Sequence, residues 1–262
     1  MLADIIWLDI ANRRRSIAGY CLGMAVYALI VVAMFPAFKT STSLDNLIRN
    51  DATAAALFGV NGPISSTGGW LNGNIYANFF PLIMLLLTIG YGAACLAGQD
   101  EDGTLGTLAA LPVRRGAIVA QKAAAMAVQA AGLAVTVAVL VIIGRSFQLS
   151  VTVTAVTAVS AAVFLMGLDF GLVTMAIGAL TGRKGTAIGV GTALAAASYL
   201  VSSLAPVVSW ISPGRYASLF YWSVGNGQIS QGVSLGDFAV LIATGLCALA
   251  ATLIAFRRLD IH

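Results

Sequence analysis

The stretch VTAVTAVSAAVFLMGLDFGLVTMAIGAL, residues 153–180, decides the fold of this chain. It is longer than the roughly 20 residues that a helix needs to cross the hydrocarbon core of a bilayer. Its only charged residue is Asp169. The stretch therefore predicts a membrane-spanning helix that carries one acidic side chain deep inside it.

Five further apolar runs share this character. With the first they predict spans at about 16–38, 76–97, 117–143, 153–180, 186–208 and 236–256. Of the 262 residues, 59% are hydrophobic and only 9% are charged, whereas an ordinary soluble domain carries about 25% charged residues. This composition excludes a water-soluble enzyme, a disordered chain and a secreted module held by disulfides. We expect an all-α integral membrane protein with six transmembrane helices in a single domain, residues 1–262.

The basic residues between the spans predict the orientation of the chain. Ten lie on one side, and four lie on the other, namely Lys39, Arg49, Arg145 and Arg215. The ten are Arg13, Arg14, Arg15, Arg114, Arg115, Lys122, Arg183, Lys184, Arg257 and Arg258. Because cytoplasmic loops carry the excess of Lys and Arg, both termini are expected in the cytoplasm, which agrees with an even number of spans. The chain is expected to be multi-pass in a bacterial plasma membrane.

Two segments outside the spans have their own predicted forms. The residues before the first span, 1–15, favour an interfacial helix that lies on the membrane, with Trp7 at headgroup depth and Arg13, Arg14 and Arg15 on its polar side. The segment 210–235 is aromatic and too interrupted to span, so it favours a re-entrant or interfacial hairpin before the sixth span.

The sequence contains no recognisable catalytic or cofactor motif. It lacks the G-x-x-x-x-G-K-[ST] phosphate loop and the G-x-S-x-G elbow, and its only histidine is the last residue, His262. The basic residues occur in short groups between apolar runs, which is typical of membrane topology and not of nucleic-acid binding. We therefore predict no catalytic residue, no metal site and no bound cofactor, and any use of ATP requires a second polypeptide.

The segment between the second and third spans has a more specific pattern. Three acidic residues at 100–102 precede a Gly-Thr-Leu sequence, spaced leucines, Pro112 and two arginines. Acidic residues favour a helix N-terminus and proline ends a helix, so the segment predicts a short cytoplasmic helix. Two interpretations are open from these residues alone: a solvated loop whose arginines fix the topology, or a docking helix for a cytoplasmic partner.

The sequence LAGQDEDGTLGTLAALPVRRGAIVAQK, residues 96–122, resembles the signature of type-2 ABC exporter permeases. Two other stretches are similar to that family, namely WISPGRY at 210–216 and AFRRLDI at 255–261. The six-span layout with a long first external loop also fits, whereas Gln99 and Gly214 depart from the residues commoner in the family.

This resemblance implies a transport subunit without its own ATPase site. Two permease chains, identical or related, would form the pathway in the lipid membrane, and two separate cytoplasmic ABC ATPase subunits would hold ATP and Mg. The cargo implied is an amphipathic drug-like molecule, an antibiotic or a lipid; a permease for polysaccharide or lipid-linked glycan is a close variant. By match to the motif, the docking residues are Asp100, Glu101, Asp102, Gly103, Thr104, Leu105, Leu108, Pro112, Arg114 and Arg115.

Asp169 leaves two interpretations open, because a carboxylate at that depth must be protonated, paired or in contact with water. It is either a site for a cationic substrate or a proton, or an interhelical constraint between Gly167 and Gly171. If it binds protons, the chain would fit a different class, an ATP-independent secondary carrier. Such carriers usually show internal repeats and several intramembrane charges, and the sequence shows no repeat and a single such acid.

Overall fold

A computed structural model of the chain describes residues 4–39, 63, 65–104 and 114–258. These residues form helices, turns and connecting segments without a β-strand. Six of the helical stretches are long and apolar enough to cross a membrane, which confirms the predicted all-α membrane fold. The helices are α1 (Asp4–Phe38), α4 (Thr67–Leu71), η1 (Asn72–Phe79), α5 (Phe80–Ala93), η2 (Ala94–Gly98), α6 (Gln99–Glu101), α8 (Arg115–Ile143), η3 (Gly144–Phe147), α9 (Val153–Thr181), α10 (Lys184–Leu204), η4 (Ser212–Ala217), η5 (Tyr221–Gly225), α11 (Gln228–Gln231) and α12 (Leu235–Arg258).

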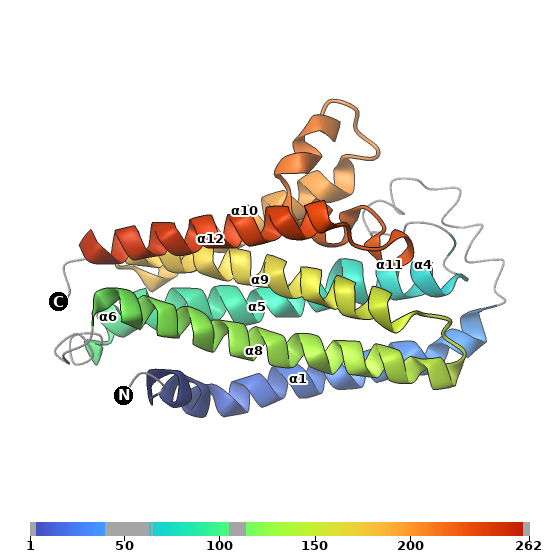
Figure 1. The fold of residues 1–262 in the computed structure, drawn as a ribbon, viewed down its shortest axis with the longest axis horizontal. Coiled ribbons are helices and arrows are strands. Elements are labelled where there is room, and N and C mark those ends of the chain that lie inside the picture. The colour runs from blue at the N-terminus through green and yellow to red at the C-terminus, as the bar shows by residue number, and fades with distance from the viewer. Residues whose placement is uncertain (1–3, 40–62, 64, 105–113, 259–262) are drawn as a thin grey trace.

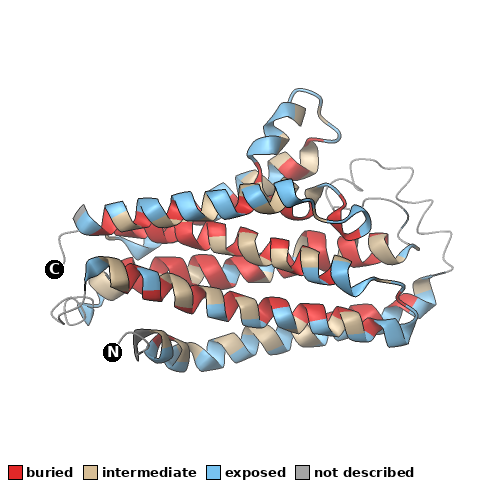
Figure 2. Ribbon diagram, viewed as in Figure 1, coloured by how far each residue is buried: buried red, intermediate tan, exposed pale blue. Residues whose placement is uncertain are grey.

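The long helices run along one direction, with α5 and α9 at the centre (Figure 1). Figure 2 shows that buried residues gather on α5, α8 and α9, whereas exposed residues dominate the outer helices. Many apolar residues of α1, α10 and α12 are exposed on the outside of the bundle and suit contact with lipid tails. The core of this chain is therefore the group of helices around α9.

The first turn of α1 and the last turn of α12 lie at the same end of the bundle as α6 (Figure 1). The turn between α9 and α10, which contains Arg183, is at this end because α9 begins at the opposite one, and Lys184 begins α10 here. Arg14, Arg15 and Arg114 are exposed here. We call it the basic end, and we call the other, which holds the segments 144–152 and 205–234, the opposite end.

The second span begins earlier than the expected position near residue 76. Helix starts at Thr67 and continues without a break through η1 into α5. The hydroxyl oxygen of Ser66 accepts a hydrogen bond from the amide of Gly69 at 3.1 Å, which caps the first turn. The glycines and asparagines of this region disfavour a helix, but burial of Trp70, Leu71 and other apolar residues overrides that local preference.

The N-terminal segment is not a helix separate from the first span. Residues from Asp4 to Phe38 form one continuous α1. Trp7 is 69% exposed, and Arg14 and Arg15 are also exposed. The membrane-surface position of the first turns stays a prediction, but Asp9 on these turns is buried in protein.

The segment before α12 folds back onto the bundle through three short helices, η4, η5 and α11. Phe220 is buried, with its ring centroid 6.2 Å from that of Phe170 in α9 and 5.3 Å from that of Tyr199 in α10. Arg215, in η4, donates a hydrogen bond to the hydroxyl oxygen of Tyr216 at 2.8 Å, and this bond raises the pKa of the guanidinium. The predicted re-entrant or interfacial hairpin, with its depth relative to a membrane, stays a prediction.

Candidate functional site

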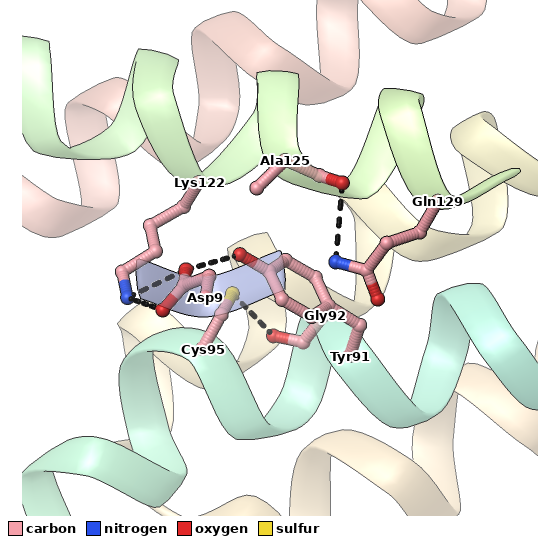
Figure 3. Close-up of polar contacts among 7 residues, drawn as sticks. All are labelled: Asp9, Tyr91, Gly92, Cys95, Lys122, Ala125 and Gln129. Atoms are coloured by element: carbon pink, nitrogen blue, oxygen red, sulfur yellow. Dashed lines mark hydrogen bonds and ion pairs between the residues drawn. The ribbon is translucent and has the colours of Figure 1, made fainter. Parts of the chain in front are cut away.

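A buried ion pair joins the first and third spans near the basic end (Figure 3). The ammonium Nζ of Lys122 on α8 lies 2.9 Å from Oδ1 and 2.8 Å from Oδ2 of Asp9 on α1. The hydroxyl of Tyr91 on α5 donates a hydrogen bond to Oδ2 of Asp9 at 2.5 Å. Lys122 is 0% exposed, so its charge is removed from water and held by the carboxylate. Three helices of the bundle meet at this cluster of Asp9, Tyr91 and Lys122.

Arg13 extends the cluster by one turn of α1. Its guanidinium carbon lies 5.1 Å from the centre of the Tyr91 ring, within the range of a cation–π contact. Arg13, which was predicted only as part of a polar helix face, therefore contacts the second span. Trp7, Arg14 and Arg15 are exposed and stay predicted surface residues.

Sequence reasoning missed Asp9 and Lys122 as a pair. Asp9 lies in the segment 1–15 that was predicted as an interfacial helix, and Lys122 was counted only among the basic residues that set the topology. Lys122 had a usable signal, because it lies inside the apolar run 117–143 and a charge within a span requires a partner. Nothing in the sequence indicated that Asp9, far away along the chain, is that partner.

The two flanks of the predicted docking segment lie at the basic end. Asp100, Glu101, Asp102, Gly103 and Thr104 follow the second span, and Arg114 and Arg115 begin the third. The predicted docking residues Leu105, Leu108 and Pro112 lie outside the described residues.

The sequence suggested that the acidic residues begin a new helix. In the structure, two of them lie at the end of the helix that forms the second span. Asp100 and Glu101 lie in α6, which continues the second span, and Asp102 and Gly103 form the turn after it. Gly103 has a φ of 69°, which glycine adopts without steric cost and which ends the helix. Thr104 is helical again, and its hydroxyl donates to the carbonyl of Gln99 at 3.1 Å. The helix of the second span thus runs beyond its apolar part to Glu101, and the rest of the predicted short helix lies outside the described residues.

Each flank contacts the end of another span. A side-chain oxygen of Glu101 accepts a hydrogen bond from the backbone amide of Lys184, the first residue of α10, at 2.9 Å. Arg115 donates to the carbonyls of Phe256 at 3.4 Å and Arg257 at 3.5 Å, in the last turn of α12. A carboxylate at a helix N-terminus and a guanidinium at a helix C-terminus both oppose the partial charges there. The flanks are thus attached to the fifth and sixth spans.

Asp169 lies in the middle of α9 and faces α12. It is 1% exposed, and its Oδ2 has no hydrogen-bond partner among the described residues. A Cβ atom added at Gly245 would lie 2.6 Å from Oδ1 of Asp169, so α12 packs closely over the carboxyl group. This placement brings Asp169 together with α12, and not with the docking flanks or the cluster at Asp9.

A cavity of about 480 Å³ lies between the second and fifth spans. Its wall is largely apolar and includes Leu85, Ile188 and Phe220. Its polar side chains include Asn78 and Tyr199, and the Tyr199 hydroxyl donates to Oδ1 of Asn78 at 3.0 Å. The cavity has the size and the mainly apolar lining of a small-molecule site. Asp169 is not among its lining residues.

Within the described part of the chain, no group of three or more His, Cys, Asp or Glu side chains is placed to hold a metal ion. The polar contacts that the fold makes near the basic end include the three-helix cluster at Asp9 and the two contacts of the docking flanks, from Glu101 to the start of α10 and from Arg115 to the end of α12.

Comparison with protein families matches residues 3–261 to the ABC-2 family transporter protein domain. The chain belongs to the ABC-2 transporter family. It is therefore a multi-pass membrane transport subunit, in agreement with its six apolar helices. Membership in the ABC-2 family implies ABC ATPase subunits as partners. A comparison with curated proteins gives no match.

Proposed function

We propose that this chain is the transmembrane subunit of an ATP-driven exporter in a bacterial plasma membrane, with both termini in the cytoplasm. The observation that carries the proposal is the attachment of the docking flanks, through Glu101 and Arg115, to the ends of α10 and α12. A partner that moves these flanks would also move two spans. The chain supplies no catalytic residue; two cytoplasmic ATPase subunits bind and hydrolyse ATP with Mg.

Coupling requires that each nucleotide state of the ATPase favours one conformation of the membrane subunit by its differential contacts. The docking surface in this proposal consists of the described residues Asp100, Asp102, Gly103, Thr104 and Arg114, together with Leu105, Leu108 and Pro112. Asp102, Gly103, Thr104 and Arg114 are exposed at the basic end, where a cytoplasmic partner has access.

The cavity between α5 and α10 supports an amphipathic substrate. Its apolar wall would receive the body of a drug-like molecule, an antibiotic or a lipid, while Asn78 and Tyr199 offer a polar contact. A polysaccharide would need many more polar partners than this wall provides. Phe79, Leu82 and Leu86 of the wall are exposed, so we propose that a second permease chain completes the pathway on that side.

The experiment that tests the proposal is purification of the tagged chain from its native membranes in a mild detergent. We expect an ABC ATPase to be retained in equimolar amount and to hydrolyse ATP. Arg114→Glu reverses an exposed charge on the docking surface and should lower the bound ATPase roughly threefold or more.

The matched control is Arg145→Glu, an equally exposed arginine at the opposite end, which should leave the bound ATPase unchanged. If no ATPase is retained by the unmodified chain, the proposal is wrong. If both variants lower the bound ATPase equally, the docking surface is wrong.

A proton-coupled carrier that uses Asp169 is the alternative function, and its buried, unpaired Oδ2 is the observation in its favour. The substitution Asp169→Asn removes the charge and the exchangeable acid proton but keeps the shape of the side chain. If the chain belongs to an ATP-driven exporter and Asp169 only packs against α12, the Asp169→Asn variant should still export the amphipathic dye rhodamine 6G from cells. Its efflux rate should stay within about twofold of that of the unmodified protein. Loss of efflux with the ATPase still bound would instead assign Asp169 a direct role in transport.

A further inference from the structure

The fifth span, α10, packs on the rest of the bundle through small residues. Its buried residues are Ala187, Gly191, Ala195 and Ser202. Small side chains let two membrane helices approach closely, and a Cβ atom added at Gly191 would overlap Oγ1 of Thr174 on α9. The first turn of α10 has a further contact, which comes from the docking segment.

The first turn of α10 is held by a residue from another helix. Arg183 occupies the N-cap position but provides no side-chain hydrogen bond to the turn. The missing acceptor comes from Glu101, whose Oε1 lies 2.9 Å from the backbone nitrogen of Lys184. A side chain that accepts from the free amides of a first turn stabilises that helix end, and a negative charge there is favourable.

A glycine of the second span lies beside this contact. A Cβ atom at Gly98 would lie 3.2 Å from Cδ of Lys184, so the lysine side chain packs closely over this part of η2. Ala187, one turn further along α10, is fully buried. A Cβ atom added at Gly178 of α9 would lie 3.6 Å from the Cβ of Ala187. The start of α10 is thus seated between the ends of the second and fourth spans.

From this junction we infer that Glu101 is a positioning residue that couples the docking segment to the wall of the cavity. The inference rests on the proposed function. Ile188, four residues after Lys184 and so about 6 Å along the helix, already lines the cavity. A displacement of the turn at residues 101–103 pulls the first turn of α10 and changes the shape of that wall. Glu101 therefore acts within this chain, whereas its neighbours in sequence face the partner.

Asp102 is the matched comparison for Glu101. It is exposed, one residue away and of the same charge, but it makes no side-chain hydrogen bond or ion pair with the described residues. Removal of either acid changes the charge of the docking segment equally. Only removal of Glu101 takes the acceptor from the first turn of α10.

The test is amide hydrogen exchange of residues 184–188 in the purified permease–ATPase complex in nanodiscs, with and without Mg-ATP and vanadate. In the unmodified complex, vanadate trapping should change the exchange of this turn. With Glu101→Ala, exchange without nucleotide should be roughly five- to tenfold faster, as for loss of a helix cap, and should no longer respond to trapping. In complexes that retain the ATPase, Asp102→Ala should keep the exchange rate of this turn and its response to trapping. Glu101→Gln, which keeps an acceptor oxygen, should also retain the response.

The amount of bound ATPase is measured in the same samples and should be equal in the unmodified protein, Glu101→Ala and Glu101→Gln. Asp102→Ala alters the docking surface, so its exchange is compared only in complexes that retain the ATPase. Equal exchange in Glu101→Ala and Asp102→Ala, or a turn that does not respond to trapping in the unmodified complex, would overturn the inference while the proposed function stands. Loss of ATPase binding in Glu101→Ala would make Glu101 a docking contact and also overturn the inference. Absence of a bound ATPase from the unmodified chain would overturn the proposed function itself.

Discussion

Replacement of Lys122 by methionine should lower the free energy of unfolding by about 3–5 kcal/mol, the largest effect expected from a single substitution in this chain. Methionine keeps the length of the side chain but removes the charge that compensates Asp9. The carboxylate of Asp9 is buried and is left with only the Tyr91 hydroxyl as a donor. The measurement is a titration of the purified protein with sodium dodecyl sulfate in mixed micelles, followed by circular dichroism.

The control for length and charge is Lys39→Met, which removes an exposed lysine at the opposite end of α1 and should change the free energy of unfolding by less than about 0.5 kcal/mol. The double variant Asp9→Asn with Lys122→Met removes both charges and keeps an acceptor for Tyr91. It should recover most of the loss, because an uncharged buried pair has no unpaired charge. If the double variant is as unstable as Lys122→Met alone, the lost packing of the lysine chain, and not the carboxylate, is the cause.

The second large effect is expected at Gly92, where α5 crosses α9. A Cβ atom at Gly92 would overlap the carbonyl oxygen of Gly171, which belongs to the backbone of α9. A flexible side chain could turn aside, but a helix backbone cannot, so Gly92→Ala must push the two central helices apart. We expect a loss of about 1–3 kcal/mol or more in the free energy of unfolding, in the range of an overpacked core, measured by the same titration.

Gly90 provides the control two residues away on the same helix. A Cβ atom there meets nothing within 4 Å. Alanine also favours a helix over glycine by about 1 kcal/mol, so Gly90→Ala should leave stability unchanged or raise it. Equal losses from Gly90→Ala and Gly92→Ala would show that the overlap with Gly171 does not control the packing of α5 on α9.

The candidate site was only partly predictable. The pattern of residues 96–122 located the docking flanks, because acid cluster, glycine and arginines occur together in sequence. It did not show that Glu101 contacts Lys184, since that bond depends on how far the helix of the second span extends and on where α10 begins. Asp169 was recognised from its depth alone, but its neighbour Gly245 was not, because a glycine gives no signal of what packs against it.

The sequence alone determined that the chain is a bundle of six membrane helices with a charged segment between the second and third. Hydropathy is a local property that adds up along a segment, so the spans and their order can be read directly from the residues. Only the tertiary structure decided which side chains meet: Asp9 with Lys122, Glu101 with the start of α10, and Gly92 with the backbone of Gly171. Those contacts depend on the rotation of each helix about its axis and on which helices are neighbours, and neither quantity is contained in the local pattern of any one span.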